Sequence, residues 1–192
     1  DRQNSEMKAQ LGGHLSDEQS DALHHILGDQ QLANVVGLAG SGKSTLLKTA
    51  YAAWSKQGVK VHGAALAGKA ADGLESASGI PARTLASLET SWKNGYEPIA
   101  PGDILVVDEA GMIGARQLKR IAEKIHGIGA KVVLVGDPDQ LQPIEAGTPF
   151  RDLIADLGAS RLSEIHRQRE TWQRQASRDL ADGIADEAMR AF

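Results

Sequence analysis

Apolar residues along the chain follow two alternating patterns. Short continuous runs of Val, Ile and Leu are typical of strands buried on both faces, and longer segments of mixed polarity are typical of covering helices. The apolar runs predict strands over 34–38, 59–66, 103–107, 131–135 and 160–165. The segments around them predict helices over 15–27, 44–57, 69–76, 84–93, 115–126, 149–157 and 171–181.

This alternation predicts an α/β fold with a mostly parallel sheet and helices on both faces. Ligands of such sheets bind beyond the carboxyl ends of the strands. The loops that follow the predicted strands are therefore where we expect chemistry. Residues 1–14 are polar and predict a flexible lead-in. Ser16 and Gln19 have the spacing of a capping box at the start of the first helix.

The loop after the first predicted strand fits the Walker A pattern in full. Residues 37–45 read GLAGSGKST. Glycines let backbone amides surround phosphates, Lys43 neutralises the β and γ charge, and the Ser44 hydroxyl ligates Mg²⁺. A plain Gly-rich turn is the alternative, but the preceding strand and the following helix favour a P-loop. The ATP-binding residues are predicted to be Gly37, Ala39, Gly40, Ser41, Gly42, Lys43, Ser44 and Thr45.

A second apolar run, Ile104–Val107, ends in the adjacent carboxylates Asp108 and Glu109. This pattern fits Walker B. Asp108 is predicted to hold Mg²⁺ through water, and Glu109 to orient and deprotonate the attacking water. The alternative is the start of a helix, where Asp and Glu are common caps.

The third loop, GDPDQLQP over residues 136–143, follows another Val-rich strand. Gln140 can there hydrogen-bond the γ-phosphate or the attacking water and report hydrolysis to the loop. A Pro-Asp turn without such a role is the alternative.

Together these segments resemble the ordered motifs of superfamily 1 helicases of the RecD-like branch. The motifs are GLAGSGKST, VVDEAGM, VGDPDQLQPI and the later RLSEIHRQ. Their residues are most similar to those in the helicase region of TraA-type conjugative relaxases. ALAGKAADGL (65–74) and GIPARTLASL (79–88) resemble DNA-contacting segments of the first motor domain. The resemblance extends from about Leu15 to Arg169.

The resemblance implies roles for individual residues. Gln19 would read adenine, Gln140 would sense the γ-phosphate, and Arg167 would approach it. Lys69 and Thr84 would lie near the DNA backbone. Other interpretations stay open: Gln19 as a capping residue, Arg167 as a surface charge, and Lys69 as a solvated side chain.

The chain also departs from the family. The stretch ARTLASLE lacks the His that related helicases often carry, and nothing after Glu170 resembles a second motor domain. Tyr51 and Tyr96 are the only tyrosines, and no His cluster accompanies them, so relaxase nicking chemistry is not expected in this chain. Trp92 and Tyr96 bracket a loop where stacking on bases is less expected than packing on the surface.

Composition limits the remaining choices. The net charge of −4 means that any DNA site is local, because proteins that grip DNA over their whole surface are usually basic. The absence of Cys excludes disulfides and Cys-based zinc sites and suits the cytoplasm. The six His form no metal-ligating set. No apolar run reaches the roughly 20 residues of a membrane span, so we expect no membrane association.

We therefore expect the ATP-binding and hydrolysing first domain of a DNA helicase, translocating 5′ to 3′ as the resemblance implies. Its partners would be Mg²⁺, single-stranded DNA, a second RecA-like domain and a relaxase domain of the same parent chain. The domain would cover 15–169, and 170–192 would be a helical segment leading to the absent second domain. The alternatives are a nucleotide- or DNA-binding module without turnover and a P-loop ATPase acting on proteins.

Overall fold

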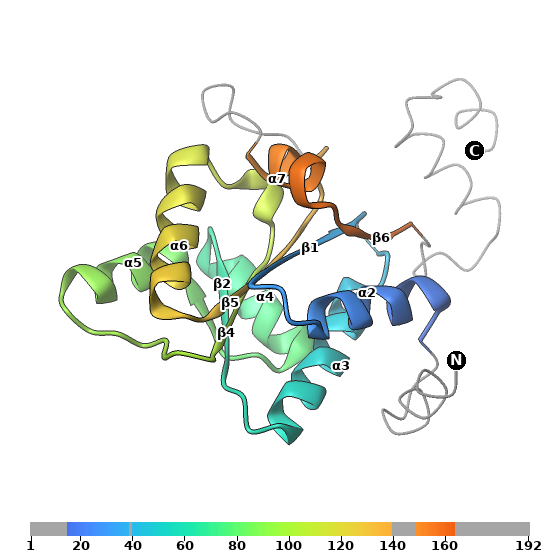
Figure 1. Ribbon diagram of the computed structural model, residues 1–192, viewed down its shortest axis with the longest axis horizontal. Coiled ribbons are helices and arrows are strands. Elements are labelled where there is room, and N and C mark those ends of the chain that lie inside the picture. The colour runs from blue at the N-terminus through green and yellow to red at the C-terminus, as the bar shows by residue number, and fades with distance from the viewer. Residues whose placement is uncertain (1–14, 39, 140–148, 164–192) are drawn as a thin grey trace.

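A computed structural model describes residues 15–38, 40–139 and 149–163 of the chain. These residues form a six-stranded sheet in the order β3-β2-β4-β5-β1-β6, and each neighbouring pair is parallel (Figure 1). The strands are β1 (Leu32–Gly37), β2 (Val61–Ala65), β3 (Ala82–Thr84), β4 (Ile104–Val107), β5 (Lys131–Gly136) and β6 (Ser160–Leu162). The helices are α2 (Asp17–Leu27), α3 (Lys43–Lys56), α4 (Gly68–Ser78), α5 (Leu85–Lys93), α6 (Ala115–Ile128) and α7 (Pro149–Leu157), with a 3₁₀ turn η1 (Ala110–Met112) after β4.

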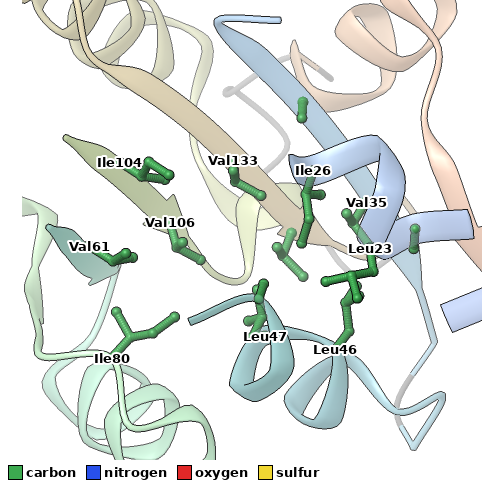
Figure 2. Close-up of a cluster of buried hydrophobic side chains, with 14 of the residues drawn as sticks. Leu23, Ile26, Val35, Leu46, Leu47, Val61, Ile80, Ile104, Val106 and Val133 are labelled. Atoms are coloured by element: carbon green, nitrogen blue, oxygen red, sulfur yellow. The ribbon is translucent and has the colours of Figure 1, made fainter. Parts of the chain in front are cut away.

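Two hydrophobic clusters lie on opposite faces of the sheet. Successive strand residues alternate between them, because side chains along a strand point to opposite faces. Val106 and Val133 face the cluster that α2, α3 and α4 cover, shown in Figure 2. Leu105 and Leu134 face the cluster that α5, α6 and α7 cover. The predicted α/β class with helices on both faces is therefore confirmed.

The structure corrects the prediction around Thr84. The sequence predicted a helix from Thr84 onward, but Ala82–Thr84 forms β3, which pairs with β2 from Gly63 to Ala65. The helix begins at Leu85, and the Thr84 hydroxyl accepts a hydrogen bond from the Ser87 amide at 3.1 Å. A strand of three residues is too short to display a periodicity, so the pattern assigned its last residue, Thr84, to the helix that follows.

The strand order brings three loops to one edge of the sheet. β5 lies between β4 and β1, and all three run in the same direction. The segments after Gly37, Val107 and Gly136 therefore leave the sheet side by side. Those are the segments that carry Walker A, Walker B and the GDPDQ motif.

Parts of the predicted organisation cannot be compared with the structure. The lead-in 1–14, the end of the last predicted strand (164–165) and the predicted helix 171–181 lie outside the described residues. Among the helices that the structure does describe, none is long and apolar enough to cross a membrane.

Candidate functional site

The loop between β1 and α3 owes its shape to glycines. Gly40 and Gly42 have φ angles of 83° and 86°, in the left-handed region that glycine adopts readily. Gly37 serves close packing instead, because a Cβ at this position would lie 2.6 Å from Ser41 Oγ. Ala39, another predicted contact of this loop, lies outside the described residues.

The start of α3 has the features of an anion site. Gly42 precedes α3 and has no side chain that could cap the helix, and the backbone amides at the positive end of a helix dipole suit an anion. Lys43 Nζ lies inside the loop and donates to the carbonyls of Gly37 and Leu38, the latter at 2.8 Å. The buried Ser41 hydroxyl finds no hydrogen-bond partner among the described residues. This set fits the phosphates of a nucleotide, with Ser44 and Thr45 following in the first turn.

Asp108 lies at the end of β4, facing the P-loop. Its Oδ1 accepts a hydrogen bond from the Glu109 amide at 2.8 Å. Burial raises the pKa of the Asp108 carboxyl, while the Glu109 N–H and the positive charge of Lys43 oppose that shift. A divalent cation would favour the ionised form of this half-buried carboxyl. Asp108 and Ser44 are thus suitable metal-holding residues.

Glu109 has an uncommon backbone conformation. With φ 55° and ψ 35°, it is the one non-glycine residue of the described chain at positive φ. Such conformations cost about 1–3 kcal/mol and persist where surrounding structure enforces them. Its side chain makes no capping hydrogen bond to η1. The structure therefore does not favour the helix-cap interpretation of Glu109.

The segment after β5 forms the turn that its Pro and Asp residues predict. Asp137 Oδ1 accepts the Asp139 amide at 2.9 Å. Arg151 from α7 donates to the Pro138 carbonyl at 3.1 Å and to Asp139 Oδ1 at 2.8 Å. Gln140 follows directly but lies outside the described residues, so its role as a sensor stays a prediction.

Gln19 is at once a capping residue and a neighbour of the P-loop. The Gln19 amide donates to Ser16 Oγ at 3.2 Å, and Gln19 Oε1 accepts from the Ser16 amide at 3.1 Å, which completes the capping box. Gln19 is buried, and its Nε2 points to the Gly42 carbonyl at 3.4 Å. The capping box is confirmed, and the adenine contact stays a prediction.

The first turn of α2 is also tied to the end of β6. The Ser163 amide donates to Glu18 Oε2 at 2.7 Å, and the Ser163 hydroxyl donates to the same carboxylate. The sequence does not predict this pair, because no local signal links residues so far apart in the chain. Ser163 precedes the EIHRQ segment with Arg167, which lies outside the described residues.

Lys69 and Thr84 lie toward the β3 edge of the sheet. Lys69 is an exposed residue in the first turn of α4, and Thr84 ends β3. The pairing of Ala65 with Thr84 brings the ends of β2 and β3 together. Because the Thr84 hydroxyl caps α5, its DNA contact stays a prediction, as does that of Lys69.

Trp92 near the end of α5 and Tyr96 in the segment after it have different surroundings. Trp92 is partly buried against the cluster of the α6 face, and Lys124 Nζ lies 5.9 Å from its ring centre. The structure thus favours surface packing for Trp92. Tyr96 is 62% exposed.

The chain is similar to known proteins over most of its length. Residues 14–192 match the family model of an AAA domain. The conjugal transfer protein TraA of Rhizobium radiobacter is 49% identical over 93% of the chain, which spans 16% of that relative. The ATP-dependent RecD2 DNA helicase of Deinococcus radiodurans is 36% identical over 84% of the chain and 22% of the relative. The crystal structure of the Pif1 helicase from Candida albicans has a TM-score of 0.66 at 23% identity, over 94% of the chain and 47% of that structure.

Proposed function

The chain belongs to the AAA domain family, and we propose that it is the ATP-binding and hydrolysing first motor domain of an ATP-dependent DNA helicase. Its predicted resemblance to RecD-like superfamily 1 helicases and TraA-type relaxases is confirmed by the relatives found. The RecA-like fold is confirmed by the parallel sheet and by the similarity to Pif1 structures.

The observation that carries this proposal is the meeting of three loops at one edge of the sheet. Lys43 and the first-turn amides of α3 would bind the β- and γ-phosphates, and Ser44 and Asp108 would hold Mg²⁺. Bound Mg²⁺ would supply charge neutralisation on the phosphates. Glu109, one residue beyond Asp108, would take the proton of the attacking water.

Other contacts of the nucleotide follow from the family resemblance. Gln140 and Arg167 would contact the γ-phosphate, and Gln19 the adenine. The position of Gln19 beside the Gly42 carbonyl supports its role, because this side chain borders the P-loop from the side of α2.

The proposed partner is single-stranded DNA, bound across the β2 and β3 ends near Lys69 and Thr84. A net charge of −4 gives little long-range attraction to DNA, so the rest of the track would come from a second RecA-like domain. The chain spans about a sixth of the length of its TraA relatives, and the proposal includes that domain and a relaxase domain in the same parent protein. Translocation would run 5′ to 3′, and the motor would act in the cytoplasm.

The test is ATP hydrolysis by the parent motor with and without single-stranded DNA, comparing wild type with Glu109→Gln. The variant keeps the shape of the side chain but loses the base, so hydrolysis should fall roughly 10²–10⁴-fold while ATP binding is retained. Glu123→Gln, at an exposed position on α6, is the matched control and should hydrolyse like wild type. Wild-type turnover by Glu109→Gln would overturn the assignment of the base. Turnover without DNA stimulation would favour an ATPase that acts on proteins.

A further inference from the structure

The left-handed conformation of Glu109 needs contacts that hold it in place. Within its own turn, the Met112 amide donates to the Glu109 carbonyl at 2.9 Å, and the Glu109 amide donates to Asp108 Oδ1 at 2.8 Å. These contacts set the turn but do not fix the position of the turn relative to the sheet. The Asp108 amide donates to the Ala64 carbonyl of β2 at 2.9 Å and ties the start of the turn to the sheet, so it is the part beyond Glu109 that a neighbouring segment supports.

That neighbour is the end of β5, which lies against the turn backbone to backbone. A Cβ built on Gly136 would lie 2.9 Å from both the Ala110 and the Gly111 amide nitrogens. A Cβ built on Gly111 would lie 2.0 Å from the Asp137 carbonyl oxygen. Two glycines therefore permit a contact that no other residue pair would allow at this separation. We name it the glycine seat, formed by Gly136 and Asp137 on one side and by Ala110 and Gly111 on the other.

Helix α7 packs behind the glycine seat, on the sheet face that α5, α6 and α7 cover. Phe150 is fully buried, and its ring lies 3.4 Å from the position of a Cβ on Gly136. Arg151 of α7 donates hydrogen bonds to the Pro138 carbonyl and to Asp139 Oδ1, in the loop that follows β5. The end of β5 consequently has little freedom to move away from the turn that contains Glu109.

We propose that Gly136 is a positioning residue for Glu109: by letting the end of β5 touch the backbone of Ala110 and Gly111, it fixes the height of the Glu109 turn above the sheet. This inference rests on the proposed function, because it matters only if Glu109 is the base. A methyl group on Gly136 would meet backbone atoms, which no change of side-chain rotamer can move aside. The turn that carries Glu109 would shift instead. A displaced base slows ATP hydrolysis but leaves the affinity of the motor for nucleotide unchanged.

The experiment is Gly136→Ala in the parent motor with single-stranded DNA. We expect kcat for ATP to fall about 10–100-fold, within the range that a positioned base contributes, and the Kd for Mg-ATP to stay within about twofold of wild type. In a Glu109→Gln background the same substitution should cause no further loss of kcat, because the group that it displaces is already gone. Gly127→Ala is the matched control: it adds the same methyl group in α6, where no atom lies within 4 Å, and should leave kcat unchanged.

A second part of the experiment asks whether a loss of kcat comes from the glycine seat or from crowding of the hydrophobic core. Phe150→Leu enlarges the space on the α7 side of Gly136 and would restore kcat to Gly136→Ala if crowding of the ring caused the loss. We expect no restoration, because the obstructing atoms are amide nitrogens. Should Gly136→Ala fail to fold, Gly111→Ala tests the same contact from the other side.

Three results would overturn the inference: wild-type kcat in Gly136→Ala, restoration by Phe150→Leu, or an equal loss with and without the Glu109 carboxylate. These differ from failure of the proposed function itself, in which Glu109→Gln alone would leave hydrolysis unchanged.

Discussion

Asp108 combines burial with a charge that the proposed function requires. Because burial raises the pKa of its carboxyl in the folded protein, its contribution to stability is fully present below its ordinary pKa and is lost as the pH rises through the folded value. Wild type therefore carries the full cost of a desolvated carboxylate at neutral pH. Asp108→Asn, which keeps an acceptor for the Glu109 amide, should raise the melting temperature of the nucleotide-free chain at pH 7 and raise it less at pH 4. A lower melting temperature at pH 7 would show that Lys43 more than compensates the buried charge.

The same variant should lose the negative charge that is proposed to hold Mg²⁺. If Asp108 holds Mg²⁺, ATP affinity in Asp108→Asn should depend on Mg²⁺ much less than in wild type. Titrations of ATP with Mg²⁺ and with a chelator measure that dependence in both proteins. An undiminished dependence on Mg²⁺ would remove Asp108 from the metal site.

The sequence predicts candidate residues for the site but not their geometry. Walker A and Walker B are local patterns with a characteristic spacing, so Lys43 and Asp108 could be proposed as site residues without a structure. The positive φ of Glu109 and the Glu18–Ser163 pair could not, because both depend on segments that meet only after the sheet has formed.

At the scale of elements, Gly127 within α6 and Gly129 directly after it both have open space around them but differ in backbone conformation. Beyond its own chain neighbours and helix backbone, a Cβ on Gly127 or on Gly129 would meet no atom within 4 Å, yet Gly129 ends the helix at φ 79°. Gly127→Ala should stabilise the fold by about 0.5–1 kcal/mol, because Ala loses less conformational freedom in a helix. Gly129→Ala should destabilise it by roughly 1–2 kcal/mol, because a side chain is strained in the left-handed region. Urea unfolding of both variants measures the difference, and equal midpoints would contradict it.

Most elements follow from the pattern of apolar residues because each strand or helix buries its own continuous stretch. The predicted helix 149–157 coincides with α7, and the predicted helix 115–126 ends two residues before α6 does. β3 and η1 were missed for a shared reason. Each has three residues, and tertiary contacts with β2 and with the end of β5 determine their conformations.

At the scale of the whole molecule, the chain holds one half of the proposed motor. We predict that residues 1–192 alone bind ATP but neither unwind duplex DNA nor hydrolyse ATP at the rate of a motor. An arginine finger from a second domain can contribute 10³–10⁵ in rate, and unwinding needs a second domain that moves when ATP binds. Steady-state ATPase and strand-displacement assays of the chain, with and without single-stranded DNA, measure both activities. DNA-stimulated turnover of several per second, or any unwinding, would show that the chain is self-sufficient.

The most direct test of an ATP-binding motor domain is a calorimetric titration of Mg-ATP into the chain and its Lys43→Ala variant. Removing a charge-assisted phosphate contact should cost about 1.5–3 kcal/mol of binding free energy, which is roughly a 10- to 150-fold weaker affinity. Lys48→Ala removes the same charge from an exposed position of α3 and serves as the control. We predict that wild type and Lys48→Ala bind alike and that Lys43→Ala binds far more weakly. Equal affinity in all three proteins would contradict the assignment of the nucleotide site.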